Sequence, residues 1–486
     1  MSVQQDTNSN SLHTPANDFR ESLGTMESTG KRKWIFPRKP KGKFTNYRTY
    51  VSWFLLITLI SLPFVKINGN PLFKLNIVAR EFYFFGNYFP VQDFYIVAIG
   101  GITFLVFIIL FTVVFGRLFC GWICPQTIFM EMVFRKIEFA IEGDRNAQMR
   151  LSRQTWNAEK IRKKGLKWFV FFILSFLIAH TFLSYIIGVE PLFRMVKEGV
   201  SLHWDTFSGL LVFTALFFFV YAWFREQACT LVCPYGRLQG VLIDRKTIVV
   251  AYDFKRGEST AGRASWKKNE DRNAAGKGDC IDCGNCVVVC PTGIDIRNGS
   301  NQLECVSCTA CIDACDEVME KINLPKGLIK YSSLENIETN TPWKFNARVI
   351  AYTLVLAVLL VIFGISVFYR PSVKAEVLRL PGMNYIEKGD AIYNQYQFDF
   401  INKTNDDKTV SIKITSPKEA SLELNGLKNS FKIKAKGEYR CPILIKIPKT
   451  KLQHSKRKIS ISIYDENGVL LDTENSNFLA PSHTIY

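Results

Sequence analysis

Five long apolar segments decide what this chain of 486 residues can fold into. They span residues 49–65, 94–115, 168–188, 207–224 and 349–368, and long charged tracts separate them. Each is close to the length that a helix needs to cross the apolar core of a bilayer. This pattern excludes a wholly soluble globular protein and a disordered one. We therefore predict a membrane α-helical protein with five spans and large parts outside the bilayer.

The distribution of lysine and arginine predicts how the chain is oriented. Their number alternates between nine, three, eleven and two in residues 1–48, 66–93, 116–167 and 189–206. Because basic loops stay preferentially on the cytoplasmic side, we expect the N-terminus and residues 225–348 in the cytoplasm and the region after Arg370 outside. The same basic residues account for the net charge of +18, so no nucleic acid is expected as a partner.

Twelve of the thirteen cysteines fall into four tight groups, which indicates metal sites rather than a disulfide framework. Eight of them form two successive runs with the spacing C-x-x-C-x-x-C-x-x-x-C. In bacterial two-cluster ferredoxins, three thiolates of such a run hold one 4Fe-4S cluster and the fourth crosses to the other cluster. The predicted ligands are Cys280, Cys283, Cys286 and Cys315 for cluster 1, and Cys305, Cys308, Cys311 and Cys290 for cluster 2.

Zinc is the alternative occupant of this segment, because paired C-x-x-C motifs also build four-cysteine zinc sites. Two complete runs in tandem favour iron–sulfur clusters. Asp316 stands where a proline usually follows the second run, which leaves the ligands unchanged. The chain has no G-x-G-x-x-G or G-x-x-x-x-G-K-[ST] motif, so nothing indicates a nucleotide site of its own. The segment is predicted to carry single electrons from a partner or a quinol.

Two C-x-x-x-C-P motifs follow the second and fourth apolar segments. Their cysteines are Cys120 and Cys124 in the first motif and Cys229 and Cys233 in the second. Pro-Leu-Phe sequences at Pro71 and Pro191 recur in the same order, which predicts a tandem repeat and a four-helix bundle with parallel pseudo-symmetry. If each helix continues through its motif, the i, i+4 spacing places both sulfurs on one face. Alternatively, the prolines start new helices, and the pKa of the preceding thiol is then lowered. Such thiolates can be redox-active or bind Cu(I), whereas buried structural cysteines are the alternative.

Three single residues are weaker candidates. His180 lies inside the third apolar segment, where an ionisable residue is a functional hypothesis, although a hydrogen bond within the bundle explains it equally well. His203 stands beside Trp204 and Asp205 and is expected to be interfacial rather than a metal or quinol contact. Cys441 stands apart from the other cysteines and is expected to be structural.

After Arg370 the pattern changes to short alternating segments typical of β-strands. They span residues 393–402, 409–415, 430–435, 443–447 and 459–464. The sequence Glu466-Asn467-Gly468 predicts a hairpin turn. With less distinct segments on either side, about seven strands are expected, which indicates an immunoglobulin-like β-sandwich. It has no catalytic constellation, so we expect a docking or structural module.

Several of these motifs resemble those of the FixG/RdxA/CcoG type of cytochrome c oxidase accessory protein. The resemblance runs from about Trp34 to the C-terminus. Its motifs are Cys120-Gly-Trp-Ile-Cys124-Pro-Gln-Thr with Glu131-Met132 and Arg135-Lys136-Ile137-Glu138, Cys233-Pro-Tyr-Gly-Arg, Tyr252-Asp253 with Arg256-Gly257-Glu258, and the eight-cysteine run. The resemblance implies five spans, a cytoplasmic double-cluster domain and an outer immunoglobulin-like domain. It also implies a role in assembling cbb-type oxidase, by reduction of Cu(II) to Cu(I).

These inferences predict five parts of the chain in the bacterial inner membrane. They are a basic cytoplasmic segment (1–48), a four-helix membrane domain (49–240), a cytoplasmic 4Fe-4S ferredoxin-like domain (241–347), a fifth transmembrane helix (348–369) and a periplasmic Ig-like domain (370–486). Copper-delivery and oxidase assembly proteins are the expected partners, and self-association is left open.

Three functions fit this plan. The leading hypothesis is a metalloreductase in which two 4Fe-4S clusters deliver electrons to copper, the probable substrate, at the C-x-x-x-C-P cysteines. The second is a quinol-linked electron carrier with His180 in a quinol pocket. The third is a non-catalytic assembly scaffold whose clusters sense redox state.

Overall fold

The structure is a computed structural model, and it forms two compact units. The described residues are 32–77, 81–268, 270–272, 274–299, 302–341, 346–380, 384–423, 430–452 and 454–481. Residues 1–31 of the predicted basic segment therefore lie outside the described part. The first unit comprises Met1–Leu62, Gly101–Ser184 and Val189–Leu360, and the second comprises Pro63–Gly100, Tyr185–Gly188 and Val361–Tyr486.

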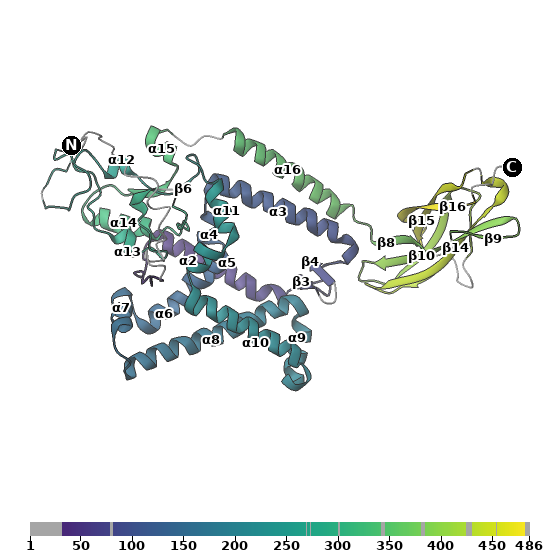
Figure 1. The fold of residues 1–486 in the computed structure, drawn as a ribbon, viewed down its shortest axis with the longest axis horizontal. Helices are drawn as coiled ribbons and strands as arrows, with labels where there is room; N and C mark the ends of the chain where they lie inside the picture. The colour runs from purple at the N-terminus through teal and green to yellow at the C-terminus, as the bar shows by residue number, and fades with distance from the viewer. Residues whose placement is uncertain are drawn as a thin grey trace, which may run out of the picture. The chain divides into compact units, whose positions relative to one another are not determined.

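Among the described residues, four helices are long and apolar enough to cross a membrane (Figure 1). They are α3 (Phe94–Phe115), α8 (Ala158–Ile187), α10 (Trp204–Phe219) with its π-helical continuation η5 (Val220–Phe224), and α16 (Ala347–Phe368). The remaining predicted span, 49–65, corresponds to α2 (Lys43–Ser61), whose first turns are polar. The number of five spans stays a prediction.

Aromatic packing joins α2 to the other helices of the first unit. The buried core residues are Phe129, Met130, Phe134, Phe171 and Tyr221. Leu56 and Leu59 of α2 pack against this core. The rings of Phe172 on α8 and Phe218 on α10 meet edge to face, with centroids 6.1 Å apart. The contacts of Leu56 and Leu59 therefore place α2 in the same bundle.

Each C-x-x-x-C-P motif begins in one short helix and is followed by others. After the second span they are α4 (Leu118–Trp122), α5 (Pro125–Thr127), the π-helical η3 (Ile128–Phe134), α6 (Arg135–Glu142) and α7 (Arg145–Arg153). After the fourth they are the π-helical η6 (Ala228–Val232) and α11 (Pro234–Leu242). The two cysteine motifs therefore share the same plan, in which a proline starts a new helix.

The predicted repeat does not extend to the Pro-Leu-Phe sequences. Pro71 ends β2 (Asn70–Pro71), and β3 (Phe73–Asn76) follows it, whereas Pro191 lies in α9 (Val189–Glu198). This part of the repeat prediction was wrong. Strand β3 pairs with β4 (Glu81–Phe84). The conformation of so short a motif is therefore decided by its strand pairing and not by its own sequence.

The cysteine-rich segment folds around a two-stranded antiparallel sheet of β6 (Val249–Tyr252) and β7 (Ile329–Ser332). Its helices are α12 (Phe254–Gly257), α13 (Asn285–Val288), η7 (Ile296–Asn298), α14 (Ala310–Lys321) and α15 (Leu334–Thr339). Val250, Ile329 and Met319 are buried in one core with the cysteines. The sheet and α14 therefore hold both cysteine runs between them.

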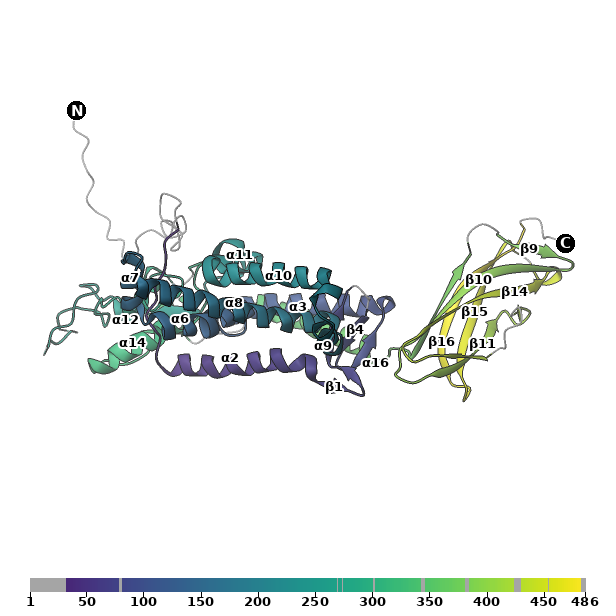
Figure 2. The same cartoon turned by 90° about the horizontal axis from the view of Figure 1, so that it is seen from below.

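Two sheets form the predicted sandwich in the second unit (Figure 2). One has the order β12 (Ser421–Glu423), β14 (Glu438–Pro448), β10 (Ala391–Asn402), β8 (Val373–Arg379), with β9 (Ile386–Lys388) on β10, and the other has the order β13 (Ser430–Ile433), β11 (Lys408–Ser416), β15 (Lys456–Asp465), β16 (Leu470–Leu479). Alternate residues of β14, including Ile443, Ile445 and Ile447, point into the core. Gly468 has φ 73° in the β15–β16 turn, so the predicted hairpin is confirmed.

A buried ion triad connects the sandwich to the loop before α3. That loop contains β1 (Lys66–Ile67), β5 (Asn87–Phe89) and η2 (Val91–Asp93). Asp93 is 1% exposed and lies 2.6 Å from Arg370 Nε and 2.7 Å from Lys403 Nζ. A carboxylate this buried requires such partners, so the triad fixes the loop against the sandwich.

Candidate functional site

The two cysteine runs wrap their sites with the same backbone turns. Asp282 and Gly284 in the first run have φ of 54° and 65°, and Ser307 and Thr309 at the equivalent positions of the second run have φ of 53° and 64°. Left-handed residues reverse the chain direction within a few residues. Helices α13 and α14 begin directly after these turns. Each run can therefore direct several thiols toward one centre.

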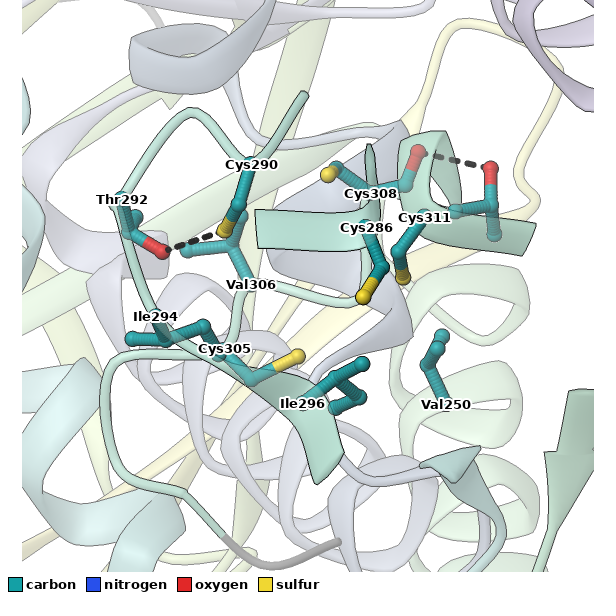
Figure 3. A pocket seen from close by; sticks show the side chains of 11 residues that line it. Val250, Cys286, Cys290, Thr292, Ile294, Ile296, Cys305, Val306, Cys308 and Cys311 are labelled. Atoms are coloured by element: carbon teal, nitrogen blue, oxygen red, sulfur yellow. Dashed lines mark hydrogen bonds between the residues drawn. The ribbon is translucent and has the colours of Figure 1, made fainter. Parts of the chain in front are cut away.

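Two pockets divide the eight cysteines as the spacing predicts. The first is lined by Cys280, Cys283, Cys286 and Cys315. The second is lined by Cys290, Cys305, Cys308 and Cys311, and also by Cys286, whose sulfur lies beside that of Cys311 (Figure 3). Cys290 and Cys315, the fourth cysteines of the two runs, thus each lie in the pocket of the other run. The structure brings together both predicted ligand sets.

The chemistry of the pockets fits iron–sulfur clusters. Burial, together with the neighbouring Cys286 and Cys280, raises the pKa of Cys315 to about 12. Burial likewise raises the pKa of Cys308 to about 12. Buried thiols deprotonate when they bind a metal centre, and apolar neighbours such as Ile296 keep water away. Among the described residues, no group of three or more His, Cys, Asp or Glu side chains is arranged to hold a single metal ion.

The C-x-x-x-C-P motifs place their second cysteines at helix starts, as predicted. Cys124 is the N-cap of α5 with Pro125 in its first turn, and Cys233 is the N-cap of α11 with Pro234 in its first turn. The Cys120 thiol donates a hydrogen bond to Gln239 Oε1 of α11, with 3.1 Å between the heavy atoms. This bond joins the first motif to the helix of the second.

All four C-x-x-x-C-P cysteines lie near one another. Burial, together with the neighbouring Cys124, Cys120 and Cys233, raises the pKa of Cys229 to about 12. The predicted lowering of the Cys124 pKa was wrong. Burial raises the pKa of Cys124, and the backbone N–H groups of Thr127 and other helix-start residues offset only part of that effect. The cysteines form a four-cysteine group, here meaning Cys120, Cys124, Cys229 and Cys233, without a ready-made single-ion geometry.

The four-cysteine group lies directly against the loop of the second pocket. A β-carbon on Gly121 would stand 2.5 Å from the carbonyl oxygen of Val306 and 2.6 Å from that of Ser307. Cys120 packs against a core that contains Cys308. A further pocket is lined by Cys229 on one side and by Pro291, Thr292 and Val306 of the cluster loops on the other. Electron transfer between the two sites therefore has a short path through packed protein.

Comparison with known proteins supports this interpretation of the cysteine sites. Residues 224–334 match a family model described as "4Fe-4S dicluster domain", and residues 97–142 match one described as "4Fe-4S binding domain". Residues 363–481 match the "IG-like fold at C-terminal of FixG".

Three relatives match most of the chain. Protein RdxB of Cereibacter sphaeroides is 34% identical over 417 residues, which cover 83% of this chain and 86% of that protein. Protein RdxA of the same organism is 35% identical over 78% of this chain and 82% of its own length. Nitrogen fixation protein FixG of Rhizobium meliloti is 28% identical over 93% of both chains. The chain belongs to the FixG/RdxA family.

In this FixG/RdxA protein, the sequence did not identify the buried arginine that lies between the cysteine sites. Arg117 is 4% exposed and donates hydrogen bonds to the carbonyl oxygens of Leu303 and Gly236. Burial lowers its pKa, and the nearby thiols Cys120 and Cys305 act in the opposite direction. The available signal was an arginine three residues before Cys120, at the end of an apolar span.

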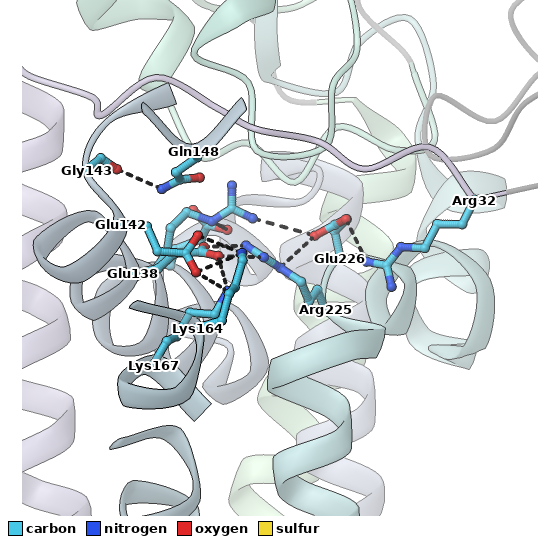
Figure 4. A network of polar contacts seen from close by, with 11 residues as sticks. Arg32, Glu138, Glu142, Gly143, Gln148, Lys164, Lys167, Arg225 and Glu226 are labelled. Atoms are coloured by element: carbon cyan, nitrogen blue, oxygen red, sulfur yellow. Dashed lines mark hydrogen bonds and ion pairs between the residues drawn. The ribbon is translucent and has the colours of Figure 1, made fainter. Parts of the chain in front are cut away.

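A buried ion network supports the second motif of the FixG/RdxA protein (Figure 4). Arg225 forms two hydrogen bonds to the Glu138 carboxylate, of 3.0 and 2.8 Å, and Lys167 Nζ lies 3.2 Å from the same carboxylate. Burial alone would raise the pKa of Glu138, but Arg225 and Lys167 lower it well below its usual range. Glu226, beside Arg225, pairs with Arg135 at 3.6 Å. Residues of the Arg-Lys-Ile-Glu motif therefore position the segment that leads to Cys229.

The single-residue candidates stay outside this arrangement. The ring nitrogen Nδ1 of His180 is 2.9 Å from the carbonyl oxygen of Phe176, so its hydrogen bond lies within its own helix. His203 Nε2 is 2.6 Å from Glu198 Oε2. Cys441 is 2% exposed in the core of the sandwich, as its structural interpretation predicts.

Proposed function

We propose that this membrane iron–sulfur protein reduces Cu(II) to Cu(I) at the four-cysteine group and thereby serves the assembly of a cbb-type cytochrome c oxidase. The observation that supports the proposal most is the position of the four cysteines directly against the loop of the second pocket, where Gly121 leaves no room for a side chain.

The proposed cluster ligands follow the two pockets. Cys280, Cys283, Cys286 and Cys315 would hold one 4Fe-4S cluster, and Cys305, Cys308, Cys311 and Cys290 would hold the other. When bound, such clusters supply electrons one at a time. The chain's own residues fix these ligands with the left-handed turns and exclude water with the apolar lining.

The proposed copper site works through the preference of thiolates for Cu(I). Soft sulfur ligands stabilise Cu(I) relative to Cu(II), so they raise the reduction potential of bound copper. Each Cu(II) takes up one electron, and binding displaces the protons of the coordinating thiols. Arg117 adds a buried positive charge beside Cys120, which favours thiolate over thiol.

The proposed setting is the bacterial inner membrane, with both cysteine sites in the cytoplasm and the sandwich in the periplasm. The alternation of basic residues supports this orientation. The proposed partners are copper-delivery and oxidase assembly proteins, because the product Cu(I) must reach an oxidase without release.

The test uses the full chain, purified without oxygen in detergent and reduced with dithionite, followed by removal of excess reductant. Addition of Cu(II) should bleach the reduced-cluster signal with about one Cu(I) formed per electron, measured with a Cu(I)-specific chelator. Clusters that stay reduced in the presence of Cu(II) would contradict the proposal. Reoxidation by a soluble quinone, and not by Cu(II), would favour the quinol-linked carrier, and reoxidation by neither would favour a scaffold.

A further inference from the structure

An aromatic and basic pocket lies in the first unit, near the start of α8. It has a volume of about 510 Å³. Its lining residues are Trp34, Phe36, Glu138, Ser152, Trp156, Lys160, Lys164, Lys167, Trp168, Phe218, Ala222, Trp223 and Arg225. Four tryptophans and four cations in one pocket indicate a ligand that has both an apolar part and a negative charge.

The charges of this pocket do not balance. The cations Lys164 and Lys167 share the Glu142 carboxylate, at 2.8 and 2.7 Å, and Arg225 pairs with Glu138. Figure 4 shows these side chains converging beside the pocket. Arg225 also lies 3.6 Å from Glu226, which is shared with Arg32 and Arg135. Three carboxylates thus serve three of the four lining cations and two further arginines. The fourth cation, Lys160, is left over.

Lys160 is the clearest sign of a missing anion. It is only 9% exposed, and its ammonium donates hydrogen bonds to the carbonyl oxygens of Ser152 (3.1 Å) and Gln154 (2.5 Å). Within the described part of the chain, no carboxylate forms an ion pair with it. These carbonyls lie at the C-terminus of α7, which favours a cation, and the Trp156 ring centroid is 5.1 Å from the ammonium, but neither carries a full negative charge. An ammonium has three donors, and burying the charge without a counter-ion is unfavourable. An anion in the pocket would accept the third hydrogen bond and neutralise the charge.

The tryptophans place the pocket at a membrane–water interface. Trp168 is where the apolar part of α8 begins, Trp223 lies in the last turn of η5, and the two side chains are 47% and 49% exposed. Trp156 and Trp34 are 66% and 42% exposed. Partly exposed tryptophans at helix ends are typical of the headgroup region of a bilayer. A ligand of this pocket can therefore arrive from the bilayer.

We propose that this pocket binds an anionic phospholipid, with the phosphate at Lys160 and Lys164 and the acyl chains along Trp168 and Phe218. Basic pockets between membrane helices at the headgroup level are suited to acidic lipid headgroups. A zwitterionic lipid would bring its own positive charge and leave the excess of the pocket in place. The proposal is independent of copper reduction.

The bound lipid would also stabilise the segment that carries the second cysteine motif. Arg225 lines this pocket and, together with Glu226, the pocket that contains Cys229. Arg225 has φ 54°, a conformation that a non-glycine residue holds only when its surroundings fix it. A phosphate at Lys164 would leave Glu142 to Lys167, which also lies 3.2 Å from Glu138, so Glu138 would be more fully available to Arg225. Acidic lipid and the geometry near Cys229 are therefore linked through one side chain.

The experiment uses the full chain in phosphatidylcholine nanodiscs, with tryptophan fluorescence as the readout. A small fraction of phosphatidylglycerol with brominated acyl chains should quench the fluorescence more strongly than the same fraction of brominated phosphatidylcholine. The difference should disappear in the Trp168→Phe/Trp223→Phe variant. Lys160→Gln should weaken the preference for the anionic lipid about fivefold, since one basic residue contributes about that much.

Matched variants separate the pocket from general surface charge. Lys163 lies on the same helix, pairs with Glu159 at 2.7 Å and does not line the pocket, so Lys163→Gln should leave the preference unchanged. Lys160→Arg should retain it, which also shows that position 160 tolerates substitution. Equal quenching by both lipids, or equal losses in Lys160→Gln and Lys163→Gln, would overturn the proposal.

Two competitors test the other occupants. Inorganic phosphate should leave the lipid preference in place, and its complete loss at millimolar phosphate would indicate a site for free phosphate instead. A short-chain quinone should not displace the brominated phosphatidylglycerol. Displacement of both brominated lipids by the quinone would identify a quinone pocket and contradict the lipid proposal.

Discussion

The two cysteine regions of this protein reach similar chemistry by different routes. In the ferredoxin-like segment, each set of three close cysteines comes from one short loop whose left-handed turns, such as those at Asp282 and Ser307, direct the thiols inward. In the four-cysteine group, the cysteines come from two distant helical segments that are joined by side-chain contacts such as Cys120 to Gln239. The first site depends on local backbone conformation, whereas the second depends on tertiary packing.

The two cluster pockets of the ferredoxin-like segment differ in what surrounds them. Cys283 of the first pocket is exposed, whereas the second pocket abuts the four-cysteine group through Val306. We expect an external donor to act near Cys283 and the acceptor to bind near Cys120. The predictions below test this division.

The largest effect is expected for the activity of reporters that show on which side of the membrane the cysteine regions and the sandwich lie. A reporter that is active only in the cytoplasm should be fully active when fused after Lys326, beside the cluster segment, and inactive when fused after Tyr486. A periplasmic reporter should give the opposite pattern. Cytoplasmic activity at Tyr486 would place the sandwich and the cysteine regions on one side and would overturn the proposed orientation.

Removal of either cysteine pair should abolish copper reduction and spare the clusters. The variants Cys120→Ser/Cys124→Ser and Cys229→Ser/Cys233→Ser each remove half of the thiolates that stabilise Cu(I). Cu(I) formation and the spectrum of the reduced clusters are measured on the same sample. Cys441→Ala, outside both regions, is the matched control and should behave as the wild type. Wild-type rates in both double variants would remove the four-cysteine group from the mechanism.

Replacement of either crossing cysteine, Cys290 or Cys315, should reduce the iron content by about half. The wild-type protein is expected to contain about eight iron and eight sulfide ions per chain, and Cys290→Ser about four. Cys315→Ser should lose the same amount but retain the other cluster, which electron paramagnetic resonance distinguishes. Stoichiometric zinc would contradict the cluster assignment. About twelve iron ions per chain would show that the four-cysteine group holds a third cluster.

The smallest effect is expected at Arg117, the buried cation between the two regions. Arg117→Gln removes a positive charge near Cys305 and should lower the reduction potential of the neighbouring cluster by about 60 mV, a tenfold change for one electron. Arg117→Lys keeps the charge and should shift the potential less. A redox titration that shows equal shifts in both variants would indicate a structural role alone.

The sequence predicted the parts of the fold whose conformation depends on neighbouring residues in the chain. The cysteine spacing, the apolar helices and the alternating strands of the sandwich all have a fixed period, so the structure follows them. The Pro-Leu-Phe repeat and the pKa of Cys124 failed because strand pairing at β3 and burial of the thiol are decided by residues elsewhere in the chain.

Several buried basic residues were not identified from the sequence, again because their environment is decided by residues elsewhere in the chain. Arg117 and Arg225 follow apolar segments in the sequence, and Lys160 belongs to a basic stretch before one, where solvated or lipid-facing positions are the usual outcome. Their burial and their partners appear only when the helices are packed. Charge counts could predict an orientation but could not identify which cations are left without a carboxylate.

The close approach of the two cysteine regions depends on the absence of a β-carbon at Gly121. Gly121 lies between Cys120 and Cys124 and meets the carbonyl groups of Val306 and Ser307, which a β-carbon would approach within 2.6 Å. Electron tunnelling rates fall steeply as the gap between donor and acceptor widens. An alanine here would force the two backbones apart without touching any cysteine, so the speed of the proposed electron transfer is set by a residue that has no side chain.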